Sequence, residues 1–129
     1  MEEISLRTQA RAELIEITDQ VQQAVRRAGV ADGICTVFVP HTTAGVAINE
    51  NADPSVRRDI VAELDRLVPR GGDYSHAEGN SDAHIKSALV GSSVQVIVAG
   101  GSLRLGVWQG IYLCEFDGPR ARQVWVTVR

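Results

Sequence analysis

Three histidines are the residues of this chain best suited to chemistry. His41, His76 and His84 are its only histidines, and each stands among small and polar residues rather than in an apolar stripe. Neutral imidazole is the commonest protein ligand of zinc, and three protein ligands with one open position are typical of catalytic zinc. Their separations of 35 and 8 residues match no local motif. They therefore predict a metal site if the fold brings them together, and three separate structural roles if it does not.

Acidic and amide residues accompany two of these histidines. Glu78, Asn80 and Asp82 share the polar run around His76 and His84. A carboxylate with a suitably tuned pKa can bind a metal or move a proton, and an amide can orient a substrate. Glu78 and Asn80 are therefore candidate catalytic residues.

A second polar group begins at the end of an expected strand, at residues 49–53. Asp53 precedes Pro54, which is typical of a helix start with Asp as the N-cap. Glu50, at the strand edge, is a candidate metal ligand or general base. Asn49 and Asp53 are candidate substrate contacts, with a simple strand end and helix cap as the structural alternative.

Several side chains could hold an anion. Thr42 and Thr43 stand before Gly45, and the hydroxyls and backbone donors of such a turn can bind phosphate. Lys86 and Arg120 are further candidate contacts, although a solvated surface position is the commoner role of such residues. These four residues predict a phosphorylated small molecule as the partner.

One aromatic residue has unusual neighbours. Trp108 and Gln109 lie between Gly106 and Gly110 at the start of an expected strand. Trp108 could stack on a planar ring while Gln109 hydrogen-bonds to its edge, or Trp108 could anchor the core. Trp125 alternates with valines and is expected to serve packing.

The elements that must position these residues can be read from periodicity. Strands are expected at residues 4–7, 12–17, 33–39, 46–49, 93–98, 108–116 and 122–128. Helices are expected at 20–28, capped by Thr18 or Asp19, at 54–67, and around 84–89, capped by Ser81 or Asp82. This order predicts a single α+β domain over residues 1–129, with mainly antiparallel sheets and two to three helices packed on them.

Composition excludes several classes of protein. The chain has 129 residues, 44% of them hydrophobic, and a formal net charge of −3. An acidic chain without a basic stripe is not expected to bind nucleic acid, and no apolar run is long enough to span a membrane. The N-terminus lacks a signal pattern, which favours the cytoplasm. Cys35 and Cys114, each inside an apolar run, are expected to be reduced core residues.

Four segments together resemble the YjbQ-like family, whose members are called secondary thiamine-phosphate synthases. They are HTTAG at 41–45, NENADP at 49–54, GNSDAHIK at 79–86, and WQGI continuing to EFDGPR over 108–120. The resemblance covers nearly the whole chain in the same order. Val107 departs from it, because relatives often carry a small hydroxyl residue there.

The resemblance implies a compact α+β fold, a homotrimer and a metal site at the histidines. It also implies an activity that joins a pyrimidine pyrophosphate to a thiazole phosphate, as a secondary activity of the family. The family's shared polar positions correspond to His41, Thr42, Thr43, Asn49, Glu50, Asp53, His76, Glu78, Asn80, His84, Trp108 and Gln109.

Residues and resemblance combine into one hypothesis. His41, His76 and His84 hold a divalent metal, zinc or magnesium, which stabilises the departing pyrophosphate, with Glu50 or Glu78 orienting a ligand or moving a proton. Two alternatives remain open. One is a metal-dependent hydrolase of a phosphorylated small molecule, and the other is a non-enzymatic trimeric module that binds such a ligand.

Overall fold

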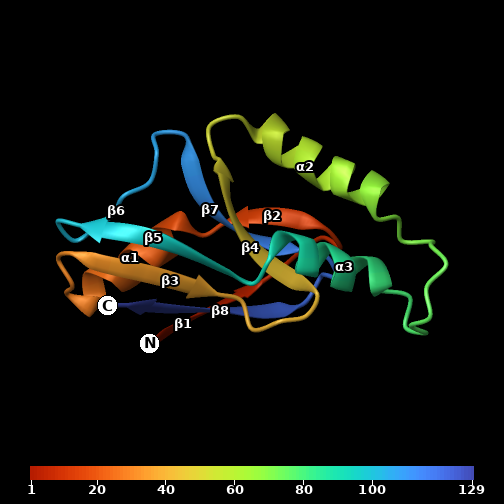
Figure 1. Ribbon diagram of the computed structural model, residues 1–129, viewed down its shortest axis with the longest axis horizontal. Coiled ribbons are helices and arrows are strands. Elements are labelled where there is room, and N and C mark those ends of the chain that lie inside the picture. Colours follow the sequence, from red (N-terminus) through yellow and green to blue (C-terminus); the bar gives the residue numbers. More distant parts are fainter.

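The computed structural model describes all residues, 1–129, as eight strands and three helices (Figure 1). The strands are β1 (Glu2–Arg7), β2 (Glu13–Glu16), β3 (Gly33–Phe38), β4 (Ala44–Glu50), β5 (Ser93–Ala99), β6 (Ser102–Leu103), β7 (Gln109–Glu115) and β8 (Ala121–Val128). The helices are α1 (Thr18–Ala28), α2 (Pro54–Leu67) and α3 (Ser81–Val90). All seven expected strands are present, and the two-residue β6 is an addition that periodicity could not reveal.

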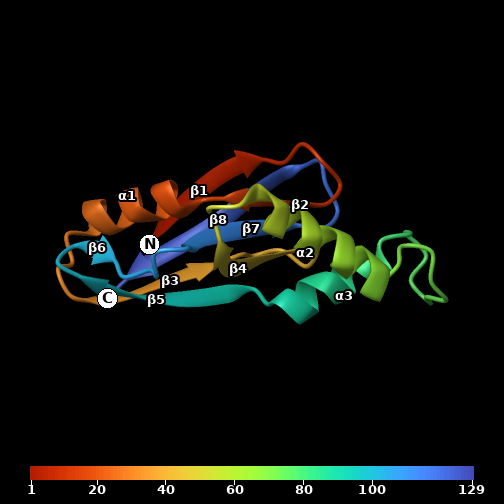
Figure 2. The ribbon, with the colours of Figure 1, turned by 90° about the horizontal axis from the view of Figure 1, so that it is seen from above.

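The strands form two sheets in which every pair is antiparallel, as the sequence predicted. One sheet has five strands in the order β1-β8-β3-β5-β6, and the other has three in the order β2-β7-β4. Figure 2 shows α1 at one end of the molecule and α2 and α3 toward the other, with the strands running between them. The molecule is therefore a single α+β domain.

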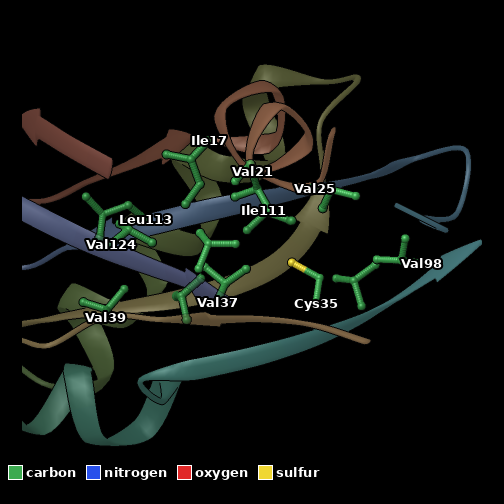
Figure 3. Close-up of a cluster of buried hydrophobic side chains, with 14 of the residues drawn as sticks. Ile17, Val21, Val25, Cys35, Val37, Val39, Val98, Ile111, Leu113 and Val124 are labelled. Carbon is green, nitrogen blue, oxygen red and sulfur yellow. The ribbon is translucent and has the colours of Figure 1, made fainter. Parts of the chain in front are cut away.

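The main core lies between the two sheets and α1 (Figure 3). Val37 of β3 and Val124 of β8 pack in one cluster with Ile111 and Leu113 of β7, and Val21 of α1 joins them beside Ile111. All five side chains are fully buried. Burying side chains of this size stabilises a fold by about 1.5–3 kcal/mol each, so this cluster is the main source of stability.

A second, smaller core lies on the opposite face of the three-stranded sheet. Tyr112 and Cys114 of β7 alternate with the residues that face the main core, and they pack with Ala83 of α3. Ile60 and Leu64 of α2 cover this cluster only partly, and no residue of α2 is fully buried. β7 is therefore buried on both faces along most of its length, which explains its continuous apolar run.

Two of the three expected helix caps are wrong. Asp53 caps α2 as predicted, since its Oδ1 accepts the Ser55 N–H at 2.9 Å. α1 instead begins after Ile17, because the Thr18 hydroxyl is used to donate to Glu16 and accept from the Ile111 N–H. α3 begins after Asn80, and no side chain caps it.

The cysteines, Trp125 and the helices can be compared with what the sequence predicted. Cys35 and Cys114 are buried free thiols, as predicted, and burial raises the pKa of Cys35 to about 11 and that of Cys114 to about 12. Trp125 packs against Phe38, with ring centroids 5.9 Å apart. None of the three helices combines the length and the apolar character needed to cross a bilayer.

Candidate functional site

Two of the three histidines meet at the exposed end of α3. The rings of His76 and His84 lie edge to face, with centroids 5.4 Å apart and planes at 84°. They open into a hollow of about 370 Å³ whose other lining residues are Asp73, Tyr74, Ser75, Ser81 and Ile85. The loop that carries His76, residues 68–80, extends beyond the sheets in Figure 1. The structure thus brings together an imidazole pair that the sequence separates by eight residues.

A carboxylate stands beside this pair. Glu78 Oε2 lies 3.6 Å from His76 Nε2, and the Glu78 side chain is 74% exposed. The distance is too long for a hydrogen bond but allows one after a small side-chain rotation. Glu78 is therefore placed to orient His76 or a bound ligand.

Buried charges fix which face of α3 turns outward. Asp82 and Lys86, one helical turn apart, are both fully buried and form an ion pair. Lys86 also pairs with Asp65 of α2, and Arg11 donates to Asp82. Because Asp82 and Lys86 face inward, the intervening His84 is directed toward the hollow.

Electrostatics hold Asp82 ionised within this network. Burial alone would raise the pKa of Asp82, but the hydrogen bond from Arg11 and the nearby charge of Lys86 outweigh it, so the pKa is lowered. Lys86 was expected to contact phosphate. Its Nζ is enclosed by carboxylates and does not reach solvent, so we assign it a structural role instead.

Asn80 and Arg120 meet at one carboxylate. Asn80 Nδ2 donates to Asp117 Oδ2 at 2.9 Å, and Arg120 Nη2 donates to the same oxygen at 3.1 Å. Asn80 Oδ1 is buried without a partner. Asn80 therefore ties the start of α3 to the β7–β8 turn, and Arg120, about half exposed, keeps a surface from which it could reach an anion.

His41 lies apart from the other two histidines. Its Nε2 accepts the Gln123 N–H of β8 at 2.9 Å. β3 ends at Phe38, and its register with β8 would set Pro40 opposite Gln123, so the imidazole supplies an acceptor where the β3–β8 pairing has stopped. With Nε2 as an acceptor, the ring proton is on Nδ1. His41 therefore has no free lone pair for a metal in this arrangement.

The charges around His41 favour its neutral form. Burial lowers the pKa of His41, and the positive charge of Arg122 lowers it further. Within the chain, no three side chains of His, Cys, Asp or Glu come together in a group that could hold a metal ion. The three histidines do not converge in one chain, in contrast to the hypothesis.

Beneath His41 lies a buried ion pair that the sequence did not reveal. Arg122 Nε donates to Glu115 Oε1 at 2.9 Å, and Arg122 Nη2 donates to Thr43 Oγ1 at 2.8 Å. Thr8 donates to the same Glu115 oxygen. Burial of Glu115 opposes ionisation, but the hydrogen bond from Arg122 prevails and its pKa is lowered. The only sequence signal was a charge at a strand position that alternation assigns to the core.

The two threonines beside His41 differ in whether their hydroxyls are free. Thr43 is buried and its hydroxyl is occupied by Arg122, so we no longer assign it to phosphate. Thr42 is exposed and remains available as a contact.

The second polar group occupies the turns where β4 ends and β7 begins. Glu50 pairs with Gln109 across the two strands, and the Asn51 N–H donates to the Trp108 carbonyl at 2.9 Å. Trp108 is 61% exposed, so it is not a core anchor. Asp53 is used as the helix cap described above.

The side-chain amides of Asn49 and Gln109 accept hydrogen bonds from nearby backbone N–H groups. Asn49 Oδ1 accepts the Glu50 N–H, and Gln109 Oε1 accepts the Gly106 N–H. In Figures 1 and 2 the β6–β7 turn and the loop that carries His76 lie toward different ends of the molecule. The predicted site residues thus form two separate groups within one chain.

A buried tyrosine holds the backbone of Glu50, and an arginine packs on the tyrosine ring. Tyr112, fully buried, donates its hydroxyl to the Glu50 carbonyl at 3.0 Å, and the Arg57 guanidinium lies over its ring at 5.1 Å from the centroid. Burial raises the pKa of Tyr112, so it remains a neutral donor. Neither Tyr112 nor Arg57 was among the site residues expected from the sequence.

A fold of two antiparallel sheets with an imidazole pair at one end defines an α+β protein with an open polar site. The family described as "UPF0047 protein YjbQ-like" matches residues 2–129, and the chain belongs to this family. The resemblance seen in the sequence is thereby confirmed.

Sequence relatives and solved structures agree with this family assignment. The chain is 51% identical to UPF0047 protein MJ1081 of Methanocaldococcus jannaschii, over 95% of this chain and 89% of that protein. It is 46% identical to UPF0047 protein YugU of Bacillus subtilis, over 95% and 94%. A YjbQ/UPF0047-family crystal structure from Clostridium acetobutylicum superposes with a TM-score of 0.99 at 56% identity, covering 100% of both chains. The Thermus thermophilus protein TT1486 gives 0.93 at 40% identity, also covering 100% of both chains.

Proposed function

We propose that this protein is a metal-dependent enzyme acting on phosphorylated small molecules, and specifically a thiamine-phosphate synthase-like transferase. It would join a hydroxymethylpyrimidine pyrophosphate to a thiazole phosphate. The single observation that supports a metal-dependent enzyme is the His76–His84 pair, which opens into a hollow with carboxylates close by. The choice of substrates rests on the resemblance of the four sequence segments. The buried free thiols fit a reducing compartment, so we place the protein in the cytoplasm.

The imidazole pair fits a divalent metal. Two histidines bound to one tetrahedral zinc at about 2.0–2.1 Å have ring centroids roughly 5 Å apart. The observed separation of 5.4 Å is close to this. His76 and His84 would hold the ion, and the neighbouring Glu78 would orient His76. His41 is removed from the proposed ligands, because its Nε2 accepts the Gln123 N–H.

A further ligand and the heterocycle contacts have to come from elsewhere. Trp108 ends the β6–β7 turn and Gln109 begins β7. This turn and the loop that carries His76 lie toward different ends of the molecule in Figures 1 and 2. A homotrimer in which this turn of one chain reaches the histidine pair of its neighbour would complete the site. The exposed Trp108 ring would then stack on the substrate heterocycle.

The chain's own residues can then be given roles. Departure of pyrophosphate develops negative charge on its oxygens, which a divalent metal stabilises when bound. Arg120, and Thr42 if the neighbouring chain brings it near, would contact phosphate oxygens. Asn80 would keep the start of α3 in place through Asp117. Glu50 or Glu78 would move a proton or orient a ligand.

Metal content and product formation test this proposal together. The wild type, His84→Ala and His41→Gln are purified, analysed for bound zinc, and assayed with the pyrimidine pyrophosphate and thiazole phosphate. We expect the wild type and His41→Gln to hold metal, and His84→Ala to lose both metal and product. Equal metal in all three would remove His84 from the site. Pyrophosphate release that does not need the thiazole phosphate would identify a hydrolase, and ligand binding without turnover would identify a binding module.

A further inference from the structure

The furrow between β2 and α2 contains an arginine that the protein does not neutralise. Arg57 lines a hollow of about 470 Å³ together with Ala12, Glu13, Leu14, Arg58, Val61, Ala62 and Asp65. Sites for small molecules commonly have volumes of about 300–1,000 Å³. This hollow shares no residue with the histidine hollow, so it is a different site.

Arg57 is half-buried and makes no ion pair with any carboxylate. Its contacts within the protein are the Tyr112 ring and a long hydrogen bond of 3.3 Å to the Tyr112 hydroxyl. Its Nε is buried and has no acceptor. Partly buried charges are normally paired, so a guanidinium left in this state is a ready binding group for an anion.

The carboxylates of the furrow are already occupied. Glu13 accepts the N–H groups of Gln9 and Ala10, and Asp65 is bound by Lys86. A second hollow shares Ala12, Val61 and Asp65 with the first, so the two adjoin. Arg70 lines that second hollow and, like Arg58, has no ion pair. The first hollow is formally balanced, with Arg57 and Arg58 against Glu13 and Asp65, and the unpaired Arg70 beside it adds one positive charge on a chain whose net charge is −3.

The walls beside Arg57 are apolar. Arg57 and Val61 are one helical turn apart on α2, as are Arg58 and Ala62, and Leu14 of β2 faces them across the hollow. An occupant needs an anionic head for the guanidinium and an apolar body for these walls. We propose that the furrow binds a small organic anion, with a carboxylate or phosphate head held by Arg57 and a short apolar body lying along Leu14 and Val61.

The proposal is tested by calorimetric titration of the full chain with benzoate and with phenyl phosphate. We expect saturable binding of at least one probe, and the tighter probe identifies the preferred head group. Arg57→Gln should weaken binding by at least about tenfold, because the fork of donors is lost. Arg58→Gln is the matched control, since it removes the neighbouring charge, and should change affinity by less than about threefold because that side chain is exposed to solvent.

Two further variants keep the test decisive. Ala62→Glu places a carboxylate in the hollow at an exposed helix position, so it should abolish binding and preserve the fold even if Arg57→Gln does not fold. His84→Ala should bind the probes normally, which separates this site from the proposed metal site. Absence of saturable binding by the folded wild type, or equal losses in Arg57→Gln and Arg58→Gln, would overturn the proposal.

Discussion

The surroundings of His41 and of His84 are opposites. His41 accepts a backbone N–H from β8 and lies over the buried Arg122–Glu115 pair. His84 lies at an open hollow, where its ring meets the ring of His76 instead of a hydrogen-bond partner. Both residues belong to segments shared with the same family. The comparison teaches that the partners of an imidazole, rather than its type or its motif, decide whether it serves the fold or is free for a ligand.

The largest expected effect is at the buried pair under His41. Glu115→Ala should lower the free energy of unfolding by about 3–5 kcal/mol, because it leaves the Arg122 guanidinium buried and uncompensated. Urea denaturation followed by circular dichroism measures this loss. The double variant Glu115→Leu/Arg122→Met should recover much of it. A loss below about 1 kcal/mol in Glu115→Ala would mean that the pair is not buried as described.

The next largest effect separates the two histidines directly. His41→Ala removes the acceptor of the Gln123 N–H, a solvent-exposed hydrogen bond, and should cost about 0.5–1.5 kcal/mol in unfolding free energy. His84→Ala removes no hydrogen bond of this kind and should cost less than about 1 kcal/mol while abolishing metal binding. Matched denaturation curves and metal analysis of the two variants give the answer. The contrast between His41 and His84 is wrong if both variants lose the same unfolding free energy.

A smaller effect should appear in the pH dependence of stability. The folded pKa of His41 is lowered, so its contribution is fully present above the unfolded value of 6.5 and is lost as pH falls from there toward the folded pKa. Thermal melts of the wild type and His41→Gln between pH 7.5 and 5 should converge on acidification. Parallel curves would contradict the prediction.

The loss of folding stability at acidic pH should come from the buried carboxylates. The pKa values of Glu115 and Asp82 are lowered from 4.5 and 3.8, so their contributions are present above these values and are lost at lower pH. The stability of Glu115→Leu/Arg122→Met should therefore fall less steeply below about pH 4.5 than that of the wild type. Melting temperatures across this range test the difference.

The smallest effect is expected at the exposed side of the histidine pair. Glu78→Gln should change unfolding free energy by less than about 0.5 kcal/mol, since both His76 and Glu78 are largely exposed. Its measurable effect should be on metal affinity, which a competition titration with a chelator reports. Unchanged affinity would remove Glu78 from the site.

Much of the fold could be predicted from the sequence. The alternating and apolar runs located seven strands, and Asp53-Pro54 located the start of α2, because these signals depend on neighbours in the chain. The start of α1 could not be predicted in the same way. The Thr18 hydroxyl that would have capped it is taken by Ile111, a residue 93 positions away.

The candidate site was predicted less completely, for the same reason. The residue types established that imidazoles, carboxylates and hydroxyls were available, and the segments established the family. Only the tertiary structure decided that His76 joins His84, that His41 serves a strand edge, and that Lys86 and Thr43 are enclosed. Whether a polar side chain is free depends on donors and acceptors brought close by folding, and their positions along the chain do not encode that proximity.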